Sequence, residues 1–252
     1  MRQSKCKNRS SLNRISFLDP THLHPMNSAM MEIKDVGLSL SGRWLFQSLN
    51  LSIPSSSFIA ITGPSGVGKT SLLRILSSKL SPTEGKITSM LKDGQDISMI
   101  FQDLQLANGA STLNNVLSGC LGRHSSFKTL LGFPKKEKET SLEWLRMFGL
   151  EKKARQWAST LSRGECQRLA ICRSMLSSPT LLLADEPVAS LDSDWANRTL
   201  HILKDSQKKR GGSVVCSLHD ENQVEQFADY VLRLDSTNPD QWRWEKLAPL
   251  DA

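Results

Sequence analysis

The sequence lacks any apolar stretch long enough to cross a membrane. Its apolar segments are short, such as FIAIT at 58–62 and LLLAD at 181–185, whereas a membrane-spanning helix needs about 18 or more such residues. The chain has 252 residues, of which 38% are hydrophobic, and this is enough for a large buried core. We therefore expect a globular protein. If it acts at a membrane, another subunit must supply the spans.

Cysteine is scarce and scattered. The five cysteines are odd in number and include no CxxC pair, which argues against both a disulfide framework and a zinc site. A reducing cytosol is the simplest setting for such a chain. The positions are Cys6, Cys120, Cys166, Cys172 and Cys216.

Most of the charge excess lies at the N-terminus. The formal net charge is +7, but the first twenty residues contain five basic side chains against the single acid Asp19. The remainder is only mildly basic, so the charge is weak evidence for a polyanion as a partner. We expect no nucleic-acid partner.

The two ends of the chain carry no periodic apolar pattern. Residues 1–30 are polar and rich in arginine and serine, and two prolines interrupt any helix. We expect a disordered basic extension or a mis-assigned start, because Met26, Met30 and Met31 stand just before the patterned sequence. A targeting peptide is the alternative, although the apolar stretch of a secretory signal is missing. Residues 237–252 are expected to form a short tail.

The patterns between these ends predict one α/β domain over residues 31–236. Short alternating segments from Glu32 to Ile53 predict antiparallel strands. The stretch SFIAITGPSGVGKTSLLRIL predicts a strand, a glycine-rich turn and a helix that ends near Ser81. A helical subdomain follows at about 103–178, and TLLLADEP and GSVVCSLHD then return to buried parallel-type strands. The expected fold is a mostly parallel sheet with helices, an antiparallel β subdomain and a helical insertion.

The glycine-rich turn GPSGVGKT matches the P-loop pattern G-x-x-x-x-G-K-[ST], and it lies between a predicted strand and a predicted helix. Its glycines let backbone N–H groups converge on phosphate oxygens, and the positive end of the helix adds to the attraction. Lys69 is expected to reach the β- and γ-phosphates, and Thr70 to ligate Mg²⁺. The core is therefore predicted to be a P-loop NTPase. The residues predicted to hold the nucleotide here are Gly63, Pro64, Ser65, Gly66, Val67, Gly68, Lys69, Thr70 and Ser71.

A second motif, which contains two acidic residues, follows about 115 residues after the P-loop. LLLADEP predicts a buried strand that ends in Asp185 and Glu186. Asp185 is positioned to hold Mg²⁺ through water, and Glu186 to polarise the attacking water. Such a general-base contribution is worth about 10²–10⁴ in rate. A pair of acids at a strand end is a modest signal alone, but its place after a P-loop makes it a strong one.

The full order of motifs resembles the ATP-binding-cassette (ABC) ATPases from about Glu32 to Leu234. The chain adds a glutamine in MIFQD, the signature-like LSRGE at 161–165, SLD at 190–192 and a histidine in CSLHD. By this resemblance the core carries an α-helical signature subdomain, and the protein binds and hydrolyses ATP with Mg²⁺.

The resemblance also implies roles for single residues. Gln102 contacts Mg²⁺ or the lytic water and senses a membrane partner. Ser190 and Asp192 lie in an inter-subunit loop, and His219 contacts the γ-phosphate. The implied catalytic residues are Glu186, His219 and Gln102, and the implied metal-binding residues are Thr70, Gln102 and Asp185.

The signature segment caps the ATP of a second copy in this family. Ser162 and Gly164 are the implied contacts, together with Asp192. The usual family sequence has Gly where this chain has Arg163, and Gln where it has Glu165. A cation in the first turn of a helix costs about 0.3–1 kcal/mol against the helix dipole, and Glu165 offsets a similar amount. We expect a working site, with Arg163 pointing away from the phosphates or skirting them.

A second departure concerns the adenine base. The family stacks it on an aromatic residue upstream of the P-loop, where this chain has Leu40 or Ser41. Trp44 is the one large ring nearby, and stacking on it would be worth about 1–3 kcal/mol. Trp44 as a packed core residue is the alternative.

The middle of the chain is similar to the ATPase of bacterial phosphonate importers, from FQDLQLANGASTLNNVLSGCLGR through SLHDENQVEQFADYVLRL. This resemblance implies import of phosphonate or a related phosphorus oxyanion. It also implies an ATP-bound homodimer, membrane permease subunits, a substrate-binding protein and a peripheral place on the cytoplasmic face of the plasma membrane. An exporter or lipoprotein-release ATPase and a soluble ABC protein are the alternatives.

Overall fold

The computed structural model describes residues 29–92, 95–123 and 133–248. The extension expected over residues 1–30 falls outside these ranges, except for its last two residues. Ala29 and Met30 already belong to the first strand, in which Met30 is buried. The patterned domain therefore includes these two residues.

The antiparallel β subdomain is confirmed. Its three strands lie in the order β2-β1-β4, with β1 (Ala29–Leu40) antiparallel to both β2 (Arg43–Pro54) and β4 (Glu84–Ser89). Several bulges shift the register of β1 against β2. Apolar side chains alternate along β1 because one face of this sheet covers the core.

The central sheet has six strands in the order β5-β6-β7-β3-β8-β9. The first five are parallel, and the last is antiparallel to its neighbour. Part of the segment expected as a short tail thus forms an edge strand beside β8. The strands are β5 (Ile97–Ile100), β6 (Leu181–Ala184), β7 (Ser213–Ser217), β3 (Phe58–Thr62), β8 (Tyr230–Arg233) and β9 (Arg243–Lys246).

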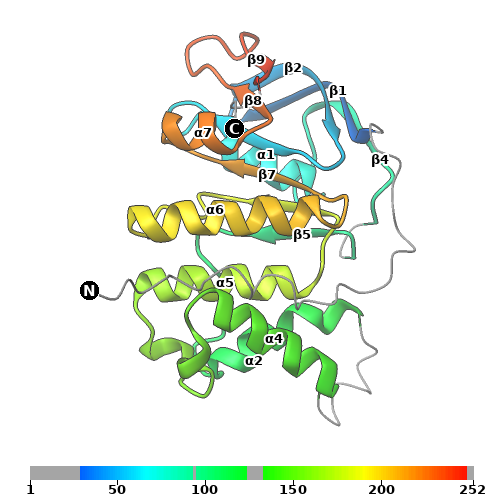
Figure 1. Cartoon of the computed structure of the whole chain (residues 1–252). Coiled ribbons are helices and arrows are strands. Elements are labelled where there is room, and N and C mark those ends of the chain that lie inside the picture. Colours follow the sequence, from blue (N-terminus) through cyan, green and yellow to red (C-terminus); the bar gives the residue numbers. More distant parts are fainter. Residues whose placement is uncertain (1–28, 93–94, 124–132, 249–252) are drawn as a thin grey trace.

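Helices surround the central sheet and form the helical subdomain at one end. Figure 1 shows α2 and α4 at the end of the molecule opposite to β1 and β2, with α5 and α6 between them. The helices are α1 (Lys69–Leu76), α2 (Thr112–Leu117), α4 (Lys135–Met147), α5 (Arg163–Leu176), α6 (Ser193–Lys208) and α7 (Glu221–Phe227), and the 3₁₀ turns are η3 (Ser118–Arg123), η4 (Glu151–Lys153) and η5 (Ala158–Thr160).

Helix α1 is shorter than the pattern predicts. It ends at Leu76 rather than near Ser81. Ser78 adopts a left-handed φ of 56°, and the backbone amides of Lys79 and Leu80 both turn back to the carbonyl of Arg74. These bonds satisfy an end carbonyl of the helix, so that the chain turns away before the proline.

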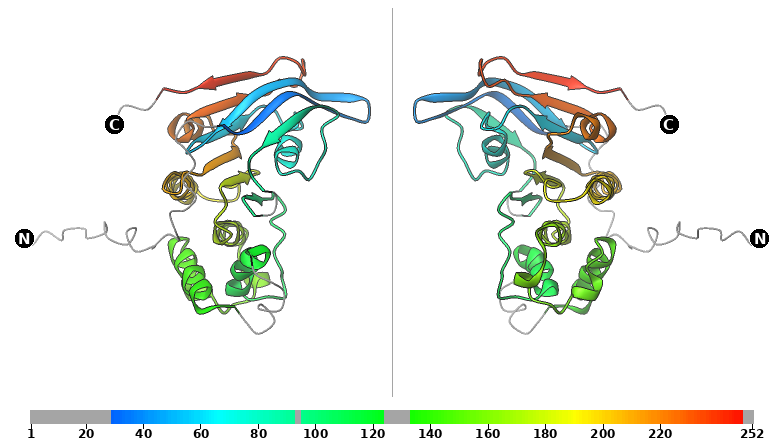
Figure 2. Two further views of the ribbon diagram at one scale, coloured as in Figure 1. Left: turned by 90° about the vertical axis from the view of Figure 1, so that its right-hand side faces the viewer. Right: turned by 90° about the vertical axis from the view of Figure 1, so that its left-hand side faces the viewer.

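Two hydrophobic clusters share the central sheet, which Figure 2 shows edge-on between its covering layers. Phe58 and Ala60 of β3 join the cluster that contains the helical subdomain. Ile59 and Ile61 join the other cluster, with β1, β2 and α1. Since β3 is packed on both faces, the loop at its carboxyl end starts from a rigid position.

Candidate nucleotide-binding site

The P-loop connects the carboxyl end of β3 to α1, in a conformation that requires glycine. Gly63 has a φ of 140° and Gly68, the N-cap of α1, has a φ of 109°. A Cβ on Gly63 would lie 2.6 Å from the carbonyl oxygen of Leu234, and one on Gly68 would lie 3.1 Å from Leu45. The first contact is closer than real Cβ atoms show, so the loop backbone lies directly against its neighbours.

The side chain of Lys69 bonds back to the backbone of the P-loop. Its ammonium donates to the carbonyl oxygens of Gly63 at 2.7 Å and Pro64 at 3.0 Å. Burial lowers the pKa of Lys69, while the carboxylates of Glu186 and Asp185 oppose this shift. The lysine therefore lies between the P-loop backbone and the two acidic residues Asp185 and Glu186.

Asp185 connects three segments at one edge of the sheet. Its Oδ2 accepts a hydrogen bond from the Thr70 hydroxyl at 2.7 Å, and its Oδ1 accepts one from the Ser217 hydroxyl at 3.0 Å. The side chain is buried, with 2% of the residue exposed. A hydroxyl beside a carboxylate is a donor set of the hard oxygen type that Mg²⁺ prefers, so these residues fit the metal that the sequence predicts.

Glu186 follows in a strained position. Its φ is 49°, in the left-handed region, and its backbone N–H donates to the Ser217 hydroxyl at 2.8 Å. Its carboxylate oxygen Oε1 lies 2.7 Å from Nε2 of His219. Non-glycine residues adopt this conformation at a cost of about 1–3 kcal/mol, and such residues gather at functional sites. The fold thus brings together the ends of β6 and β7.

Ser217 is a site residue that the sequence reasoning missed. It holds both Asp185 and Glu186, and it is fully buried at the end of β7. The available signal was its place two residues before His219, on a strand predicted to lie parallel to LLLADEP.

Gln102 and the front of the P-loop lie on the surface. Gln102 is exposed two residues after β5, whose last carbonyl, that of Ile100, accepts from the backbone N–H of Asp185 at 2.9 Å. The described part of the chain therefore places Gln102 at the same edge of the sheet as Asp185. Pro64, Ser65 and Gly66 are also exposed, whereas Val67 is buried and Ser71 half-buried.

The signature segment starts α5, away from this constellation. The Ser162 hydroxyl accepts from the backbone N–H of Glu165, and the Glu165 carboxylate accepts from that of Ser162, which forms a capping box. Glu165 also pairs with Lys153 at 2.6 Å, and this hydrogen bond, with that from Ser162, lowers its pKa. Arg163 is exposed in the first turn.

Asp192 lies in the loop before α6. It is exposed and caps the helix, accepting from the backbone N–H of Trp195 at 2.9 Å. Gly164 lies against this loop, because a Cβ on it would be 3.0 Å from the Ser190 carbonyl oxygen. The signature segment and the SLD loop are therefore neighbours within one chain.

The region upstream of the P-loop leaves both interpretations of Trp44 open. Leu40 is 45% exposed at the turn between β1 and β2, and Trp44 is half-buried in β2. The next two residues of β2, Leu45 and Phe46, both lie against Gly68. Trp44 is thus close in sequence to the P-loop contact and partly accessible.

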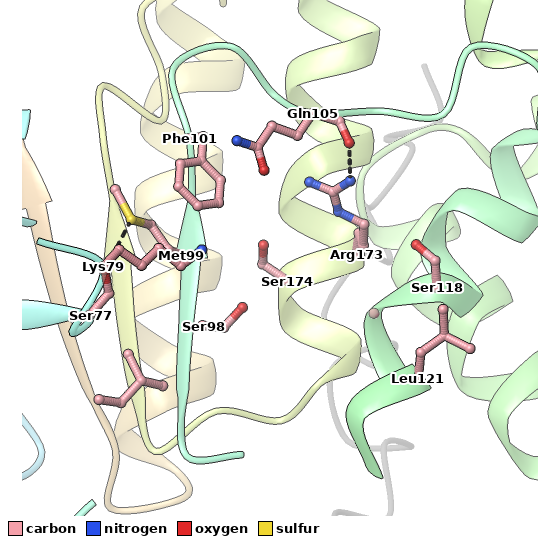
Figure 3. Close-up of a pocket in the computed structure, with 12 residues that line it drawn as sticks. Ser77, Lys79, Ser98, Met99, Phe101, Gln105, Ser118, Leu121, Arg173 and Ser174 are labelled. Atoms are coloured by element: carbon pink, nitrogen blue, oxygen red, sulfur yellow. Dashed lines mark hydrogen bonds between the residues drawn. The ribbon is translucent and has the colours of Figure 1, made fainter. Parts of the chain in front are cut away.

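A separate pocket of about 430 Å³ opens between β5, the end of α1, η3 and α5. Figure 3 shows Arg173 of α5 facing Gln105, with Lys79 and Phe101 across the pocket. Arg173 donates to the carbonyls of Gln105 at 2.6 Å and Leu104 at 2.7 Å, and both of these residues have positive φ. The Lys79 ammonium lies 4.1 Å from the centre of the Phe101 ring. The pocket therefore contains two cations beside the loop that carries Gln102.

Comparison with known proteins shows the same assignment. The family described as "ABC transporter" matches residues 46–189, which is more than half of the chain. The Phosphonates import ATP-binding protein PhnC of Treponema denticola is 34% identical over 221 residues, covering 82% of this chain and 86% of the relative. The Phosphite import ATP-binding protein PxtA of Stutzerimonas stutzeri is 34% identical, covering 84% and 81%.

Solved structures agree with these sequence relatives. The dimeric structure of MJ0796, a bacterial ABC transporter cassette, has a TM-score of 0.75 and 29% identity, and the match covers 88% of this chain and 100% of that one. A post-hydrolysis dimer of the same cassette, bound to ADP and phosphate, also has a TM-score of 0.75, at 28% identity over 88% and 100%. The chain therefore belongs to the ABC transporter family, as an ATP-binding and ATP-hydrolysing subunit.

Proposed function

We propose that this subunit energises the import of phosphonate or a related phosphorus oxyanion. Relatives named for phosphonate and phosphite import match more than four-fifths of the chain, and the similarity includes the helical subdomain. The observation that carries the catalytic part is the convergence of Thr70, Asp185, Glu186 and His219 at one edge of the sheet.

The site residues divide the work of hydrolysis by position. The P-loop amides and Lys69 hold the phosphates, since their donors and positive charge converge at the start of α1. Mg²⁺, when bound by Thr70 and Asp185 with help from Gln102, would neutralise charge on the phosphate oxygens. Glu186 accepts a proton from the attacking water, and His219, 2.7 Å away, holds that carboxylate.

The chain is proposed to act as a homodimer that closes on ATP. Ser162, Gly164 and Asp192 are exposed or half-buried, and none of the contacts described joins them to their own P-loop, as expected for residues that serve a second copy. Closure then moves the membrane subunits, and hydrolysis resets them. ATP binding thereby shifts the population from separated to closed subunits.

The pocket beside Gln102 is the proposed docking site for a permease segment. None of the described helices combines the length and apolar character needed to span a bilayer. The pocket offers Lys79 and Arg173 together with Phe101 and Leu121, which suits a short helix that carries an acidic residue. In this arrangement the subunit lies on the cytoplasmic face of the membrane, and a substrate-binding protein delivers the solute from the other side.

The first experiment measures Mg²⁺-dependent ATP hydrolysis by the purified chain and its Glu186→Gln variant, with dimerisation followed by light scattering. We expect turnover in the parent, and an inactive variant that dimerises with ATP. Absence of both turnover and an ATP-dependent dimer would contradict the proposal. The solute is tested by reconstitution with the permease and binding protein. Methylphosphonate or phosphite should stimulate hydrolysis, and sulfate should not.

The two alternative functions, one in transport and one outside it, predict different results in the reconstituted system. An exporter or lipoprotein-release ATPase would be stimulated without any binding protein. A soluble ABC protein would bind no permease, and Arg173→Gln would then change nothing. Under our proposal, Arg173→Gln keeps basal hydrolysis and lowers stimulation by the permease.

A further inference from the structure

Trp195, near the start of α6, packs against two arginines. The guanidinium carbon of Arg168, on α5, lies 4.1 Å from the centre of its ring, and that of Arg198, on α6, lies 4.8 Å from it. The indole and Arg168 are both half-buried. Cations this close to an indole face are attracted by its quadrupole, and partial burial strengthens the attraction.

Both arginines also bind the carboxyl end of α4. Arg168 donates to the carbonyl of Phe148 at 2.7 Å, and Arg198 donates to that of Met147 at 3.1 Å. Cations are favoured at this end of a helix, where unpaired carbonyls gather. The arginine–tryptophan stack therefore ties together three helices, namely α4, α5 and α6.

The chain leaves α4 in a glycine turn that packs directly against the indole of Trp195. Gly149 has a φ of 69°, and the backbone amides of Gly149 and Leu150 turn back to Arg146 and Leu145, as in a Schellman motif. A Cβ on Gly149 would lie 3.0 Å from Cζ2 of Trp195. Helix α4 thus ends directly against the ring.

The stack borders the two segments that are proposed to face a second copy. On one side, the backbone N–H of Trp195 donates to the Asp192 carboxylate. On the other, Arg168 lies about one helical turn after Gly164, which itself lies against Ser190. Burial lowers the pKa of Arg168, and the carboxylates of Glu165 and Asp192 oppose this shift, so both segments place an acid near its guanidinium.

We propose that Trp195 is a positioning residue that holds the signature segment, 162–165, and the SLD loop, 190–192, in one fixed arrangement for the ATP of a second copy. This inference rests on the proposed function. A surface that is already ordered loses less conformational freedom when two copies associate. The stack is not needed for the P-loop of the same chain, which lies on other elements. It should therefore affect dimerisation and leave nucleotide binding by the monomer intact.

The test uses the full chain carrying Glu186→Gln, so that ATP-bound dimers persist. Trp195→Ala, Trp195→Phe and a matched control, Trp244→Ala, are added separately. Trp244 also lies in an aromatic stack, with Tyr230 at 5.3 Å, but on the β8–β9 hairpin. Binding of a fluorescent ATP analogue is measured on dilute monomer, and dimerisation with ATP is measured by light scattering over a range of protein concentrations.

Trp195→Ala should raise the dimer dissociation constant about tenfold, as expected for loss of two partly buried cation–π contacts. Monomer binding of the analogue should change less than about twofold. Trp195→Phe should recover most of the affinity, because a ring remains beside the guanidinium groups, and Trp244→Ala should dimerise like the parent.

Unchanged dimerisation of Trp195→Ala would overturn the inference, as would an equal loss in the control. If Trp195→Ala does not fold, Arg198→Gln decides, because Arg198 is exposed and its removal leaves the indole packed on Arg168. Dimerisation of Arg198→Gln at the parental level would then overturn the inference. A parent that binds the analogue but never dimerises with ATP would instead overturn the clamp itself, and the inference with it.

Discussion

The carboxylate of Glu186 lies 2.7 Å from Nε2 of His219, although the two residues come from the ends of different strands. Each residue is next to a strand end of the parallel sheet, β6 for Glu186 and β7 for His219. Carboxyl ends of parallel strands meet at one edge, and ligand sites form there. The contact places the proposed general base and its partner within hydrogen-bond reach.

His219→Ala is expected to lower kcat about 100-fold, with KM for ATP changed less than about threefold, because the histidine holds the base and contributes little to binding. Steady-state hydrolysis over a range of ATP concentrations measures both constants. His201→Ala is the control, since His201 packs edge-on against Phe227 and touches no site residue among the contacts described. An increase in KM at constant kcat would contradict the role given to His219.

Ser217→Ala is expected to lower both stability and turnover. Its hydroxyl is fully buried and bonds both Asp185 and the Glu186 amide, so its removal should cost about 1–3 kcal/mol of unfolding free energy. Ser213→Ala is a matched control, because Ser213 is equally buried at the other end of β7 and bonds Ser57 and Pro54. Urea unfolding should show similar losses in both, while only Ser217→Ala reduces kcat. Equal activities would show that Ser217 is structural alone.

Alanine at three glycines separates close contact from backbone conformation. Gly63→Ala should abolish ATP binding and destabilise the fold by about 2 kcal/mol or more, because the new Cβ meets Leu234 at a φ of 140°. Gly42→Ala, with φ 79° and open space around it, should cost about 1 kcal/mol and leave binding intact. Gly109→Ala, which has open space and no positive φ, should be near neutral. Thermal unfolding and nucleotide titration test the ranking, and a neutral Gly63→Ala would refute it.

Glu165→Gln isolates the charge of the capping box, because glutamine can still accept from the Ser162 amide. The pKa of Glu165 is lowered in the folded chain, mainly by Lys153. Its contribution is therefore present above the unfolded pKa and is lost as pH falls through the folded pKa. The variant should lose about 1 kcal/mol of unfolding free energy at pH 7 and lose less as the pH falls below about 4. Urea titrations at pH 7 and at a pH below about 4 measure this difference, and Lys153→Met serves as the partner variant. A pH-independent loss would assign the effect to packing.

Thr70→Ala should raise the Mg²⁺ concentration needed for half-maximal hydrolysis about tenfold, because one of the proposed oxygen ligands beside Asp185 is removed. Chelation should stop hydrolysis in the parent, and added Mg²⁺ should restore it. Ser77→Ala, at the far end of α1, serves as control. An unchanged Mg²⁺ requirement in Thr70→Ala would remove this residue from the metal site.

Several features of the fold followed from the sequence because their causes are local. The glycines of the P-loop and the apolar run before them act within a few residues. The α/β class and the antiparallel subdomain were therefore predicted correctly. The sequence predicts a later end for α1 than the structure shows, because the left-handed turn at Ser78 lacks the glycine that usually marks such a turn in a sequence.

Other features depend on how distant segments meet. Thr70 and Asp185 are 115 positions apart, and their hydrogen bond exists because only β7 separates β6 from β3 in the sheet. The same strand order brings the Ser217 hydroxyl within hydrogen-bond distance of the Asp185 carboxylate and the backbone N–H of Glu186. The pairing of Glu165 with Lys153 and the packing of Trp195 against two arginines likewise need the helical subdomain to be folded.

The sequence alone determined the α/β class, the strand–loop–helix unit of the P-loop and the chemistry of the motifs, because backbone conformation depends on near neighbours. The tertiary structure alone decided which distant segments meet. It places Ser217 beside Asp185 and Glu186, and it pairs Lys153 with Glu165. It also adds a strand from the C-terminal segment to the edge of the central sheet. These pairings depend on long-range strand order and on shared burial, which no short stretch of sequence contains.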